Sequence, residues 1–258
     1  MEALDELRER RACECRLTPD RALQSLDEAE AFLLDRGLLT RTSDSALPAL
    51  YDACHEEAYK PGSGGFGDWP RTKWPWFGEL AGRGHLVVGV HRGKNMLVSH
   101  DVAAVLDPIC RAEIERMRAA APDWDRLLDH LTVAGPSTIE DLQVELDLKP
   151  KELKATRSPL ERCGAIVARS LHVTAGEGHT RSSELWRLDQ AYSGGGAEDV
   201  GRAVRDLLVA GVRAAVVAPE RELRRWFSWT WYWDESLVDD LVREGRLTRV
   251  DGHVAFAL

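Results

Sequence analysis

The sequence has few cysteines and no pattern typical of a metal site. Its five cysteines are Cys13, Cys15, Cys54, Cys110 and Cys163, and no two of them are spaced C-x-x-C. A zinc site needs ligands clustered at set spacing, and a disulfide framework needs an even set of cysteines, so neither is expected. We predict reduced thiols, as in a cytosolic protein, and no bound metal.

Long hydrophobic runs are also missing. No apolar stretch approaches the roughly 20 residues that a membrane-spanning helix requires. The N-terminal segment MEALDELRERR is charged throughout and lacks the apolar region of a secretory signal. We therefore expect a cytoplasmic protein that has no membrane partner.

Motifs of catalysis and cofactor binding are missing as well. There is no G-x-S-x-G, P-loop or H-E-x-x-H pattern. Gly62, Gly64 and Gly67 match the G-x-G-x-x-G spacing, but a predicted helix precedes them and prolines follow, so we interpret this stretch as a loop. His55 stands beside Cys54 and two glutamates, but no third group is seen to position a base, which favours a polar helix end. No catalytic residue and no cofactor is predicted.

What the sequence does contain is a repeated local pattern: the end of an amphipathic helix, a glycine, and an extended apolar segment. It recurs at Gly37, Gly84, Gly164 and Gly245, and a turn-rich hairpin follows the last three. Glycine after a helix adopts the left-handed conformation that ends the helix without steric cost. A helix that ends on glycine and leads into a hairpin is the second half of a winged helix. The last three glycines lie about eighty residues apart, the scale of one small domain each.

The predicted fold is therefore mainly α with small β-hairpins (α+β), built of tandem winged helix-turn-helix units. We place unit one at residues 1–121, unit two at 122–192 and unit three at 193–258, with a linker at 193–196. In unit two, Ser137 with Glu140 is the predicted cap of the second helix, and Pro150 opens the third, with a break allowed at Pro159. Residue patterning predicts helices over 25–35, 46–59, 76–80, 102–121, 125–134, 150–163, 198–210, 220–228 and 234–244. It predicts strands over 85–91, 95–100, 165–174 and 184–189, and a short hairpin over 247–258 around Asp251 and Gly252.

Basic charge is concentrated in the third predicted helix of unit two, where a winged helix places its recognition helix. The chain as a whole has a net charge of −9, which disfavours non-specific binding of nucleic acid. Residues 149–169, however, hold six basic side chains against two acidic ones, a local charge of +4. Such a run either contacts phosphates on both sides of a groove or forms a solvated helix face. The candidate DNA contacts of unit two are Lys149, Lys151, Lys154, Arg157, Arg169, His179 and Arg181.

Unit one has a smaller set of candidate DNA contacts, Lys73, Arg92 and Lys94. Tryptophans lie between its basic residues, and aromatic rings in that setting either stack on unpaired bases or pack against the domain. Because these tryptophans stand next to prolines, packing is the favoured interpretation. They are Trp69, Trp74 and Trp76.

Unit three is acidic where unit two is basic. Its third predicted helix carries Glu235, Asp239 and Asp240, whose carboxylates would repel phosphate. We therefore expect this helix to face solvent, another unit or a protein partner. The aromatic run 226–233, WFSWTWYW, is too apolar to be fully exposed, and we predict that it packs unit three against its neighbours.

Two blocks of the sequence resemble the AlkZ/YcaQ family of bacterial DNA glycosylases. WDRLLDHLTVAGPSTIEDL, with LERCGAIVARS and ELWRLDQAY, resembles the middle winged helix of that family, and VRDLLVAGVRAAVVAPERELRRWF resembles the start of the next. The resemblance spans about residues 30–258 and implies three winged helices that associate with double-stranded DNA. Family members excise alkylated or crosslinked bases and use a glutamine–apolar–glutamine motif to position water.

The sequence departs from the family at that catalytic motif. Its only glutamines are Gln24, Gln143 and Gln190, so no Gln-x-Gln pair exists and no catalytic residue is transferred. Three functions stay open. The first is a DNA-binding protein of repair or of alkylation and crosslink damage recognition. The second is a non-enzymatic protein-interaction scaffold or transcriptional regulator that binds a partner through its acidic third unit. The third is an active glycosylase with a different water-positioning group.

Overall fold

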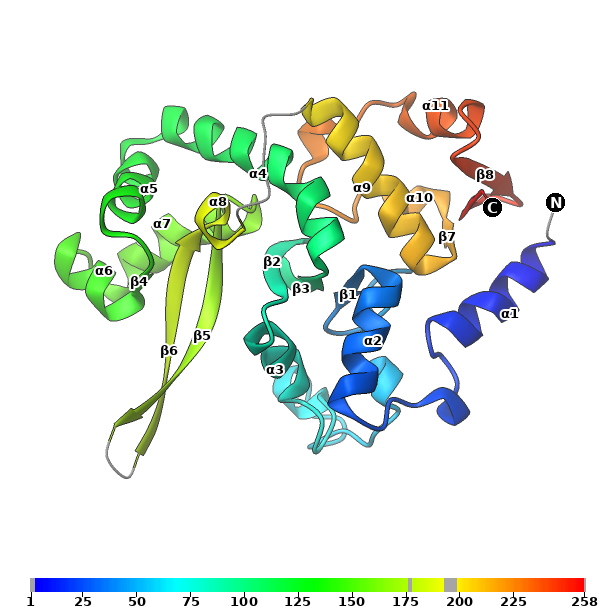
Figure 1. Cartoon of the computed structure of the whole chain (residues 1–258), viewed down its shortest axis with the longest axis horizontal. Helices are drawn as coiled ribbons and strands as arrows, with labels where there is room; N and C mark the ends of the chain where they lie inside the picture. The colour runs from blue at the N-terminus through cyan, green and yellow to red at the C-terminus, as the bar shows by residue number, and fades with distance from the viewer. Residues whose placement is uncertain (1–2, 176–177, 193–198, 258) are drawn as a thin grey trace.

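The fold is mixed α+β, with small antiparallel sheets between helices (Figure 1). The computed structural model describes residues 3–175, 178–192 and 199–257. Three three-stranded sheets have the orders β1-β3-β2, β4-β6-β5 and β7-β9-β8. In each sheet the last strand along the chain lies in the centre, between the early strand that follows a helix and its own hairpin partner. The same strand order therefore recurs three times along the described chain.

The first part of the chain forms one sheet and the helices around it. Ser25 caps α2 by accepting from the N–H of Glu28 at 3.2 Å, and Gly37, at φ 82°, ends the helix as expected. The two-residue turn at Arg92 and Gly93, both with positive φ, closes the hairpin. The elements are α1 (Leu4–Glu14), η1 (Pro19–Arg21), α2 (Leu26–Arg36), β1 (Leu38–Thr40), η2 (Asp52–Cys54), η3 (Gly65–Asp68), α3 (Trp76–Gly82), β2 (Leu86–His91), β3 (Lys94–Val98) and α4 (His100–Ala120).

The helix expected over 46–59 does not form. Instead, the chain loops round after β1 and passes parallel to the end of that strand. The N–H of Leu50 bonds to the carbonyl of Thr40 at 2.9 Å, and Thr40 and Ala49 form a parallel bridge. Only the short helix η2 remains of the predicted element. Pro48, which cannot donate to a helix, and backbone pairing with β1 together explain the difference.

The second part forms a complete helix–strand–helix–helix–hairpin unit. Pro150 stands at the first position of its third helix, as expected, and the helix runs past Pro159 without a break. Thr138 with Asp141 forms the capping box of α6, one residue later than the predicted pair Ser137 and Glu140. The elements are α5 (Pro122–Ala134), β4 (Ser137–Thr138), α6 (Ile139–Glu145), α7 (Pro150–Arg162), β5 (Ile166–Ala175), β6 (Gly178–Arg187) and α8 (Leu188–Ala191).

The third part begins with a long amphipathic helix and ends in a short hairpin. The helix predicted over 220–228 forms only over four residues. The tryptophan-rich segment that follows is not helical there, because its rings pack into the core. The elements are α9 (Val200–Ala215), β7 (Val217–Pro219), α10 (Glu220–Leu223), η4 (Thr230–Tyr232), α11 (Leu237–Arg243), β8 (Leu247–Val250) and β9 (His253–Phe256).

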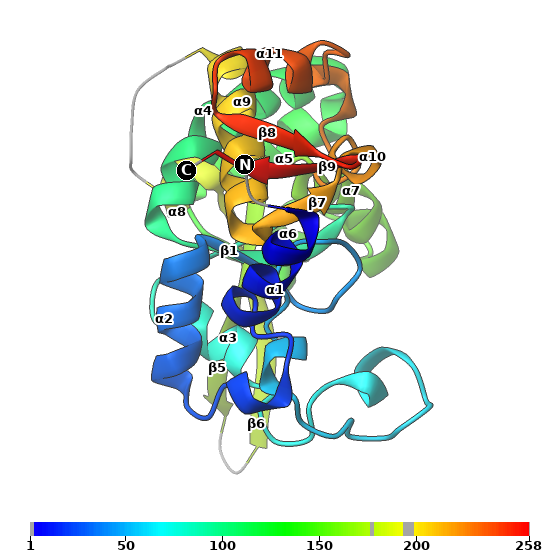
Figure 2. The same ribbon diagram turned by 90° about the vertical axis from the view of Figure 1, so that its right-hand side faces the viewer.

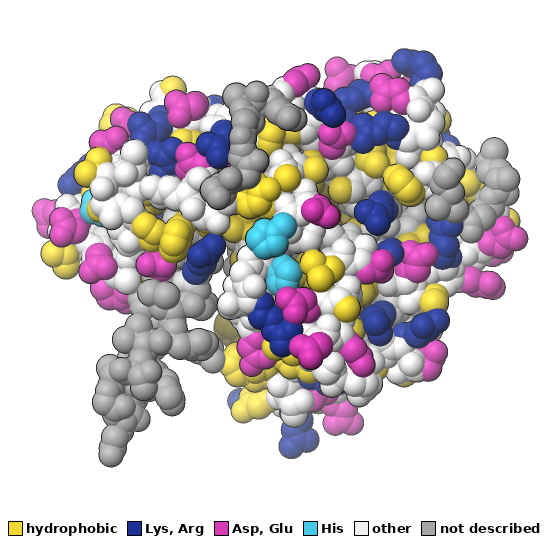
Figure 3. Space-filling model, viewed as in Figure 1, with side chains coloured by type: hydrophobic (Ala, Val, Ile, Leu, Met, Phe, Trp, Pro, Cys, Tyr) yellow, Lys and Arg dark blue, Asp and Glu magenta, His cyan; other side chains and the backbone are white. Residues whose placement is uncertain are grey.

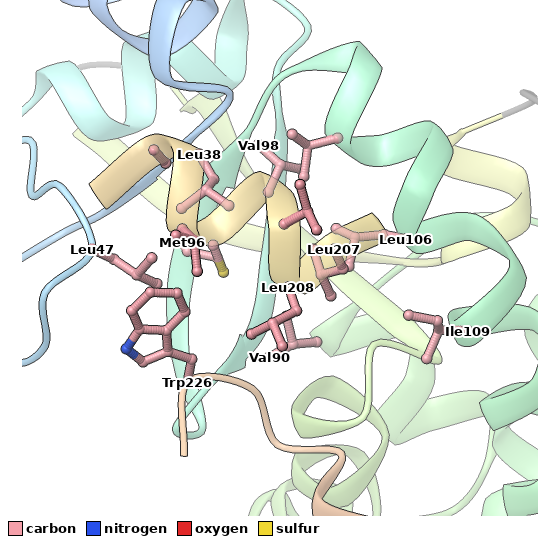
Figure 4. Packing of buried hydrophobic residues seen from close by; sticks show 14 of the residues in the cluster. Leu38, Leu47, Val90, Met96, Val98, Leu106, Ile109, Leu207, Leu208 and Trp226 are labelled. Atoms are coloured by element: carbon pink, nitrogen blue, oxygen red, sulfur yellow. The ribbon is translucent and has the colours of Figure 1, made fainter. Parts of the chain in front are cut away.

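The first and third parts share one hydrophobic core (Figure 4). Leu38 and Val98 from the first sheet and Leu106 from α4 pack with Leu207 of α9 and the fully buried ring of Trp226. At the other end of the chain, α1 packs Leu7 against β7 and β9 (Figure 2). A second cluster joins the helices of the second part to the C-terminal half of α4. Helix α4 therefore contributes to both clusters and connects them.

The aromatic run packs inward, as predicted. Trp226 and Trp229 are buried, and the N–H of Ser228 bonds to the carbonyl of Val90 at 2.8 Å. Trp231 is half exposed but donates to Glu113 of α4 at 3.1 Å. The run thus fixes the third part against the hairpin β2–β3 and against α4.

Candidate nucleic-acid interface

The three lysines at the start of α7 are exposed, and no described residue forms an ion pair with them. Lys149, Lys151 and Lys154 all lie on the solvent side of the first two turns, while Leu153 and Thr156 face the core. No ion pair involves these lysines in the described part of the chain, whereas Arg157, Arg205 and Arg249 each pair with a carboxylate. Three exposed ammonium groups on one helix end, without ion pairs among the described residues, are suited to phosphate contacts.

Acidic residues lie close to these lysines in the sequence. Glu145 and Asp147 precede α7 and are exposed, and Glu152 accepts from the backbone N–H of Lys149 at 2.8 Å. The stretch 145–154 is therefore neutral, and the local charge of +4 arises further along, at the arginines. The lysines alone do not make this end of α7 strongly basic.

Two of the predicted arginines already have partners inside the protein. Arg157 pairs with Glu161 at 2.7 Å, and burial of that carboxyl raises the pKa of Glu161. The guanidinium of Arg169 lies 4.5 Å from the ring of Trp186. A cation held on an aromatic face keeps its charge but has fewer free donors. We expect a smaller contribution to DNA binding from these arginines than from the lysines.

The hairpin β5–β6 is much longer than sequence patterning predicted. Its ten-residue strands pair from Ile166–Arg187 to Ala175–Gly178, so β6 starts six residues before the strand expected at 184. Figure 1 shows it projecting away from the helices as a two-stranded arm. His179 and Arg181 belong to its outer part, and their side chains lie outside the described residues.

The C-terminal end of α7 is covered by the first part of the molecule. A Cβ placed on Gly89 of β2 would come within 2.8 Å of the carbonyl oxygen of Glu161. Helix and strand therefore approach each other as closely as only glycine permits. Because this end of α7 is packed, the N-terminal turns with their lysines are the part of the helix that remains open to a ligand.

The unit one candidates are held by internal contacts. Lys73 donates to the carbonyl of Leu23 at 2.7 Å, and its Nζ lies 5.5 Å from the ring of Trp76. Lys94 pairs with Asp44, and Arg92 donates to the carbonyls of Asp44 and Arg225. The hairpin tip is thus fastened to the third part of the chain. Their role in DNA binding stays a prediction, and each would have to exchange a protein contact for a phosphate.

A buried histidine completes the cluster around Asp44. His91, 1% exposed, contacts Asp44 Oδ1 at 2.8 Å through Nε2 and the carbonyl of Trp226 at 2.7 Å through Nδ1. Burial works to raise the pKa of Asp44, but hydrogen bonds from Lys94 and His91 outweigh it and lower that pKa. Sequence analysis did not find this cluster, because its members come from a loop, a strand end and the aromatic segment.

The tryptophans of unit one pack against the body of the protein, which was the favoured interpretation of the sequence. Trp69, Trp74 and Trp76 all lie against the cluster built on Phe77, Leu80 and Leu97. They are not free platforms for bases.

The acidic residues of α11 are neutralised within the chain. Asp240 pairs with Arg243 at 2.7 Å, and Asp239 pairs with Arg249 at 2.6 Å. On the face shown in Figure 3, acidic and basic side chains are interspersed. The contact of this helix with a protein partner remains a prediction.

Four of the five cysteines are buried, and Cys13 is exposed. Burial raises the pKa of Cys15 to about 11 and those of Cys54 and Cys163 to about 12, so these thiols are poor nucleophiles. Within the described ranges no group of three His, Cys, Asp or Glu side chains is placed to hold a metal ion. No helix there is both long and apolar enough to cross a bilayer.

Comparison with known proteins identifies a fold relationship. No protein-family model matches the sequence, and no curated protein matches it. Among solved structures, the chain is similar to the Streptomyces sahachiroi DNA glycosylase AlkZ, with a TM-score of 0.57 and 17% sequence identity. The match covers 100% of this chain and 70% of that protein. The fold is therefore AlkZ-like, which confirms the predicted fold class. At this identity, the likeness says nothing about activity.

Proposed function

We propose that this protein binds double-stranded DNA, mainly through α7 and the β5–β6 arm, and that it acts in DNA repair or in recognition of alkylated or crosslinked bases. The observation that carries the proposal is the set of three exposed, unpaired lysines at the open end of α7. The AlkZ-like fold supports it, because the neighbour of known structure is a DNA glycosylase. No catalytic residue is assigned, since the three glutamines lie on separate segments: before α2, on α6 and on α8.

The test is a titration of a fluorescent duplex at several salt concentrations. We expect binding that weakens steeply with salt, because phosphate contacts release counterions. The variant K149A/K151A/K154A should bind more weakly. If all three lysines contact phosphates, the slope of log K against log salt should become shallower by about 2.7.

Two control variants separate charge from structure. K149R/K151R/K154R keeps the three charges and should retain duplex affinity and its salt slope. R213A removes an exposed cation from the last turn of α9, outside the proposed interface, and should leave both unchanged. Equal binding by the alanine triple variant and the native protein would show that α7 is not the interface.

A second duplex that carries an alkylated base tests the repair part of the proposal. Tighter binding of this duplex than of the intact one is expected. Abasic sites in the product would establish excision, and carboxylate or histidine substitutions would then locate the catalytic group. Equal affinity for both duplexes would remove damage recognition. No duplex binding at low salt would overturn the proposal and leave the protein-interaction scaffold.

A further inference from the structure

The segment between Ala58 and Pro70 is a closed loop of defined shape. Its ends are bridged in antiparallel fashion, and the N–H of Tyr59 bonds to the carbonyl of Trp69 at 2.8 Å. Inside the loop, the hydroxyl of Ser63 donates to the carbonyl of Lys60 at 2.6 Å. A Cβ on Gly67 would lie 1.5 Å from that hydroxyl, so only glycine fits. The loop is the compact, self-bonded type that often carries function.

Two aromatic rings of this loop face solvent. Phe66 is 74% exposed and Tyr59 is 57% exposed. Phe66 is supported from below, because its ring meets that of Trp69 edge-on with centroids 4.3 Å apart, and Trp69 in turn packs on Tyr51 at 5.3 Å. Phe66 therefore stands on the partly buried ring of Trp69, and two large apolar rings lie exposed to water on one loop, a feature that often marks a binding surface.

Arg41 lies against the aromatic rings under the loop and has no anionic partner among the described residues. The guanidinium of Arg41 is 4.8 Å from the ring of Trp69 and 4.3 Å from that of Phe77. Its Nε is buried, and no carboxylate or carbonyl accepts from the guanidinium in the described part of the chain. Burial lowers the pKa of Arg41. The two rings hold this guanidinium as Trp186 holds that of Arg169. Unlike Arg169, which also donates to the carbonyl of Ala191, Arg41 has donors that no described residue accepts, and guanidinium groups fit phosphate well.

Two more cations frame the same loop. Lys60 lies beside the ring of Tyr59, with Nζ 6.0 Å from its centroid, and Arg71 is exposed at the neck. Neither pairs with a carboxylate within the described residues. Glu56 is already used, since it accepts from Thr72 and from the backbone of Lys73. In Figure 2, the loop projects on the same side of the molecule as α7.

We infer that the 58–70 loop is a stacking platform for an unpaired base of a DNA strand, with Tyr59 and Phe66 as the stacking rings and Arg41 as the phosphate contact. Three cations flank the rings, Arg41, Lys60 and Arg71, against the exposed carboxylates of Glu57 and Asp68. Rings with cations beside them favour nucleic acid over an apolar protein surface, because every base offers a flat face and every nucleotide an anion. The inference deepens the proposed function and rests on it, since the partner is taken to be DNA. It adds a contact for unpaired nucleotides, separate from duplex binding at α7.

The test compares three fluorescent probes: a paired duplex, the same duplex with one unpaired thymidine, and a single-stranded oligothymidine. We expect the native protein to bind the bulged duplex about five- to a hundredfold more tightly than the paired one. Y59A/F66A should lose that preference and its affinity for oligothymidine, but keep its affinity for the paired duplex. L34A is the matched control, since Leu34 is 58% exposed on α2, away from the loop, and it should change nothing.

A separate variant tests the arginine. Arg41→Met keeps an unbranched stem between the two rings and removes a cation that has no described anion. Its urea midpoint should not fall, yet oligothymidine binding should weaken and the salt slope should become shallower by about 0.7. A loss of stability with unchanged binding would show that Arg41 is structural only.

Each remaining outcome decides between the two proposals. Oligothymidine binding that Y59A/F66A abolishes, with no duplex binding at any salt, supports the platform and overturns duplex binding at α7. Equal affinity for bulged and paired duplexes, with no oligothymidine binding, overturns the platform alone. If Y59A/F66A instead changes the oligomeric state in light scattering and leaves DNA binding intact, the rings contact protein and the inference is wrong.

Discussion

The indole N–H of Trp229 donates to the backbone carbonyl of Cys163 at 2.9 Å. Trp229 belongs to the aromatic segment of the third part of the chain, and Cys163 ends α7, the helix that carries the proposed DNA contacts. The next residue, Gly164, has no room for a side chain, because a Cβ there would lie 2.7 Å from the sulfur of Cys110. The open end of α7 is therefore held in place by contacts at its opposite end.

Replacing Trp229 by Phe removes this hydrogen bond while keeping an aromatic ring. The buried carbonyl of Cys163 is then left without its donor, so we expect the free energy of unfolding to fall by about 1–3 kcal/mol. Urea denaturation would measure it. W233F is the control, since the indole N–H of Trp233 donates no hydrogen bond in the described residues. An equal loss in both variants would mean that ring volume, not the hydrogen bond, is responsible.

The buried carboxylate of Glu113 links α4 to the aromatic segment of the third part of the chain. Glu113 is fully buried and accepts from Arg116 at 2.6 Å, from Trp231 and from Tyr232, whereas the Arg116 side chain is 44% exposed. Arg116→Ala leaves a buried charge without its cation, with a loss of up to about 3–5 kcal/mol in unfolding free energy. Glu113→Gln should cost less, because the arginine can turn to water. Urea midpoints that rank E113Q as the more damaging variant would contradict this account.

The close approach of α7 and β2 predicts a position-specific effect of adding one methyl group. Gly89→Ala forces its Cβ against the Glu161 carbonyl, and we expect a loss of about 1–3 kcal/mol from overpacking. The control is Gly78→Ala in α3, where nothing lies within 4 Å of the new Cβ. That change should stabilise by up to about 1 kcal/mol, because alanine is the better helix former. Thermal unfolding of both variants compares them, and a neutral G89A would refute the contact.

Helix ends and turn chemistry followed from local sequence, because they depend on a few neighbouring residues. Gly37 with positive φ and Pro150 at the start of α7 are both where residue type alone places them. The predicted N-cap of α6 is wrong by one residue. Ser137 and Thr138 both suit the cap position, and only the pairing of β4 with β6 decides that Thr138 takes it.

Elements whose conformation depends on residues distant in the sequence could not be predicted from local residue types. The segment 46–59 has apolar residues at helical spacing, yet it pairs with β1 instead. Which basic residues are free also depends on distant partners. Lys94 and Arg92 look like Lys149 in the sequence, but a loop carboxylate fifty residues away holds Lys94. Whether Arg41 has an anionic partner is likewise decided by the fold. The proposed stacking platform on the loop could therefore not be predicted from the sequence pattern.

Acid should weaken the contact between α2 and the start of β2. Hydrogen bonds from His85 and Arg83 lower the pKa of Glu30. A carboxyl whose pKa is lower in the folded state stabilises the fold above its unfolded pKa of about 4.3, and that stabilisation is lost as the pH falls through the lowered value. Glu30→Gln should therefore be less stable than the native protein at neutral pH, with the difference shrinking in acid. Urea midpoints across the pH range would show it.

The control for this pH effect is Glu115→Gln. Glu115 is exposed on α4 and takes part in no hydrogen bond or ion pair among the described residues. Its stability difference from the native protein should stay flat with pH. A Glu30→Gln difference that is equally flat would show that the contacts of Glu30 with His85 and Arg83 add no stability.

Thiol reactivity gives a test of the packing that needs no DNA. The thiolate is the reactive form, and both burial and a raised pKa suppress it. Cys13 is exposed, whereas Cys15, Cys54, Cys110 and Cys163 are buried, and burial raises the pKa of each of the four. In the folded protein at mildly alkaline pH, a chromogenic disulfide reagent should label one thiol quickly and four only after unfolding in denaturant. Cys13→Ser should abolish the fast phase, and rapid labelling of a second thiol would show that the contact around Cys163 and Trp229 opens in the native state.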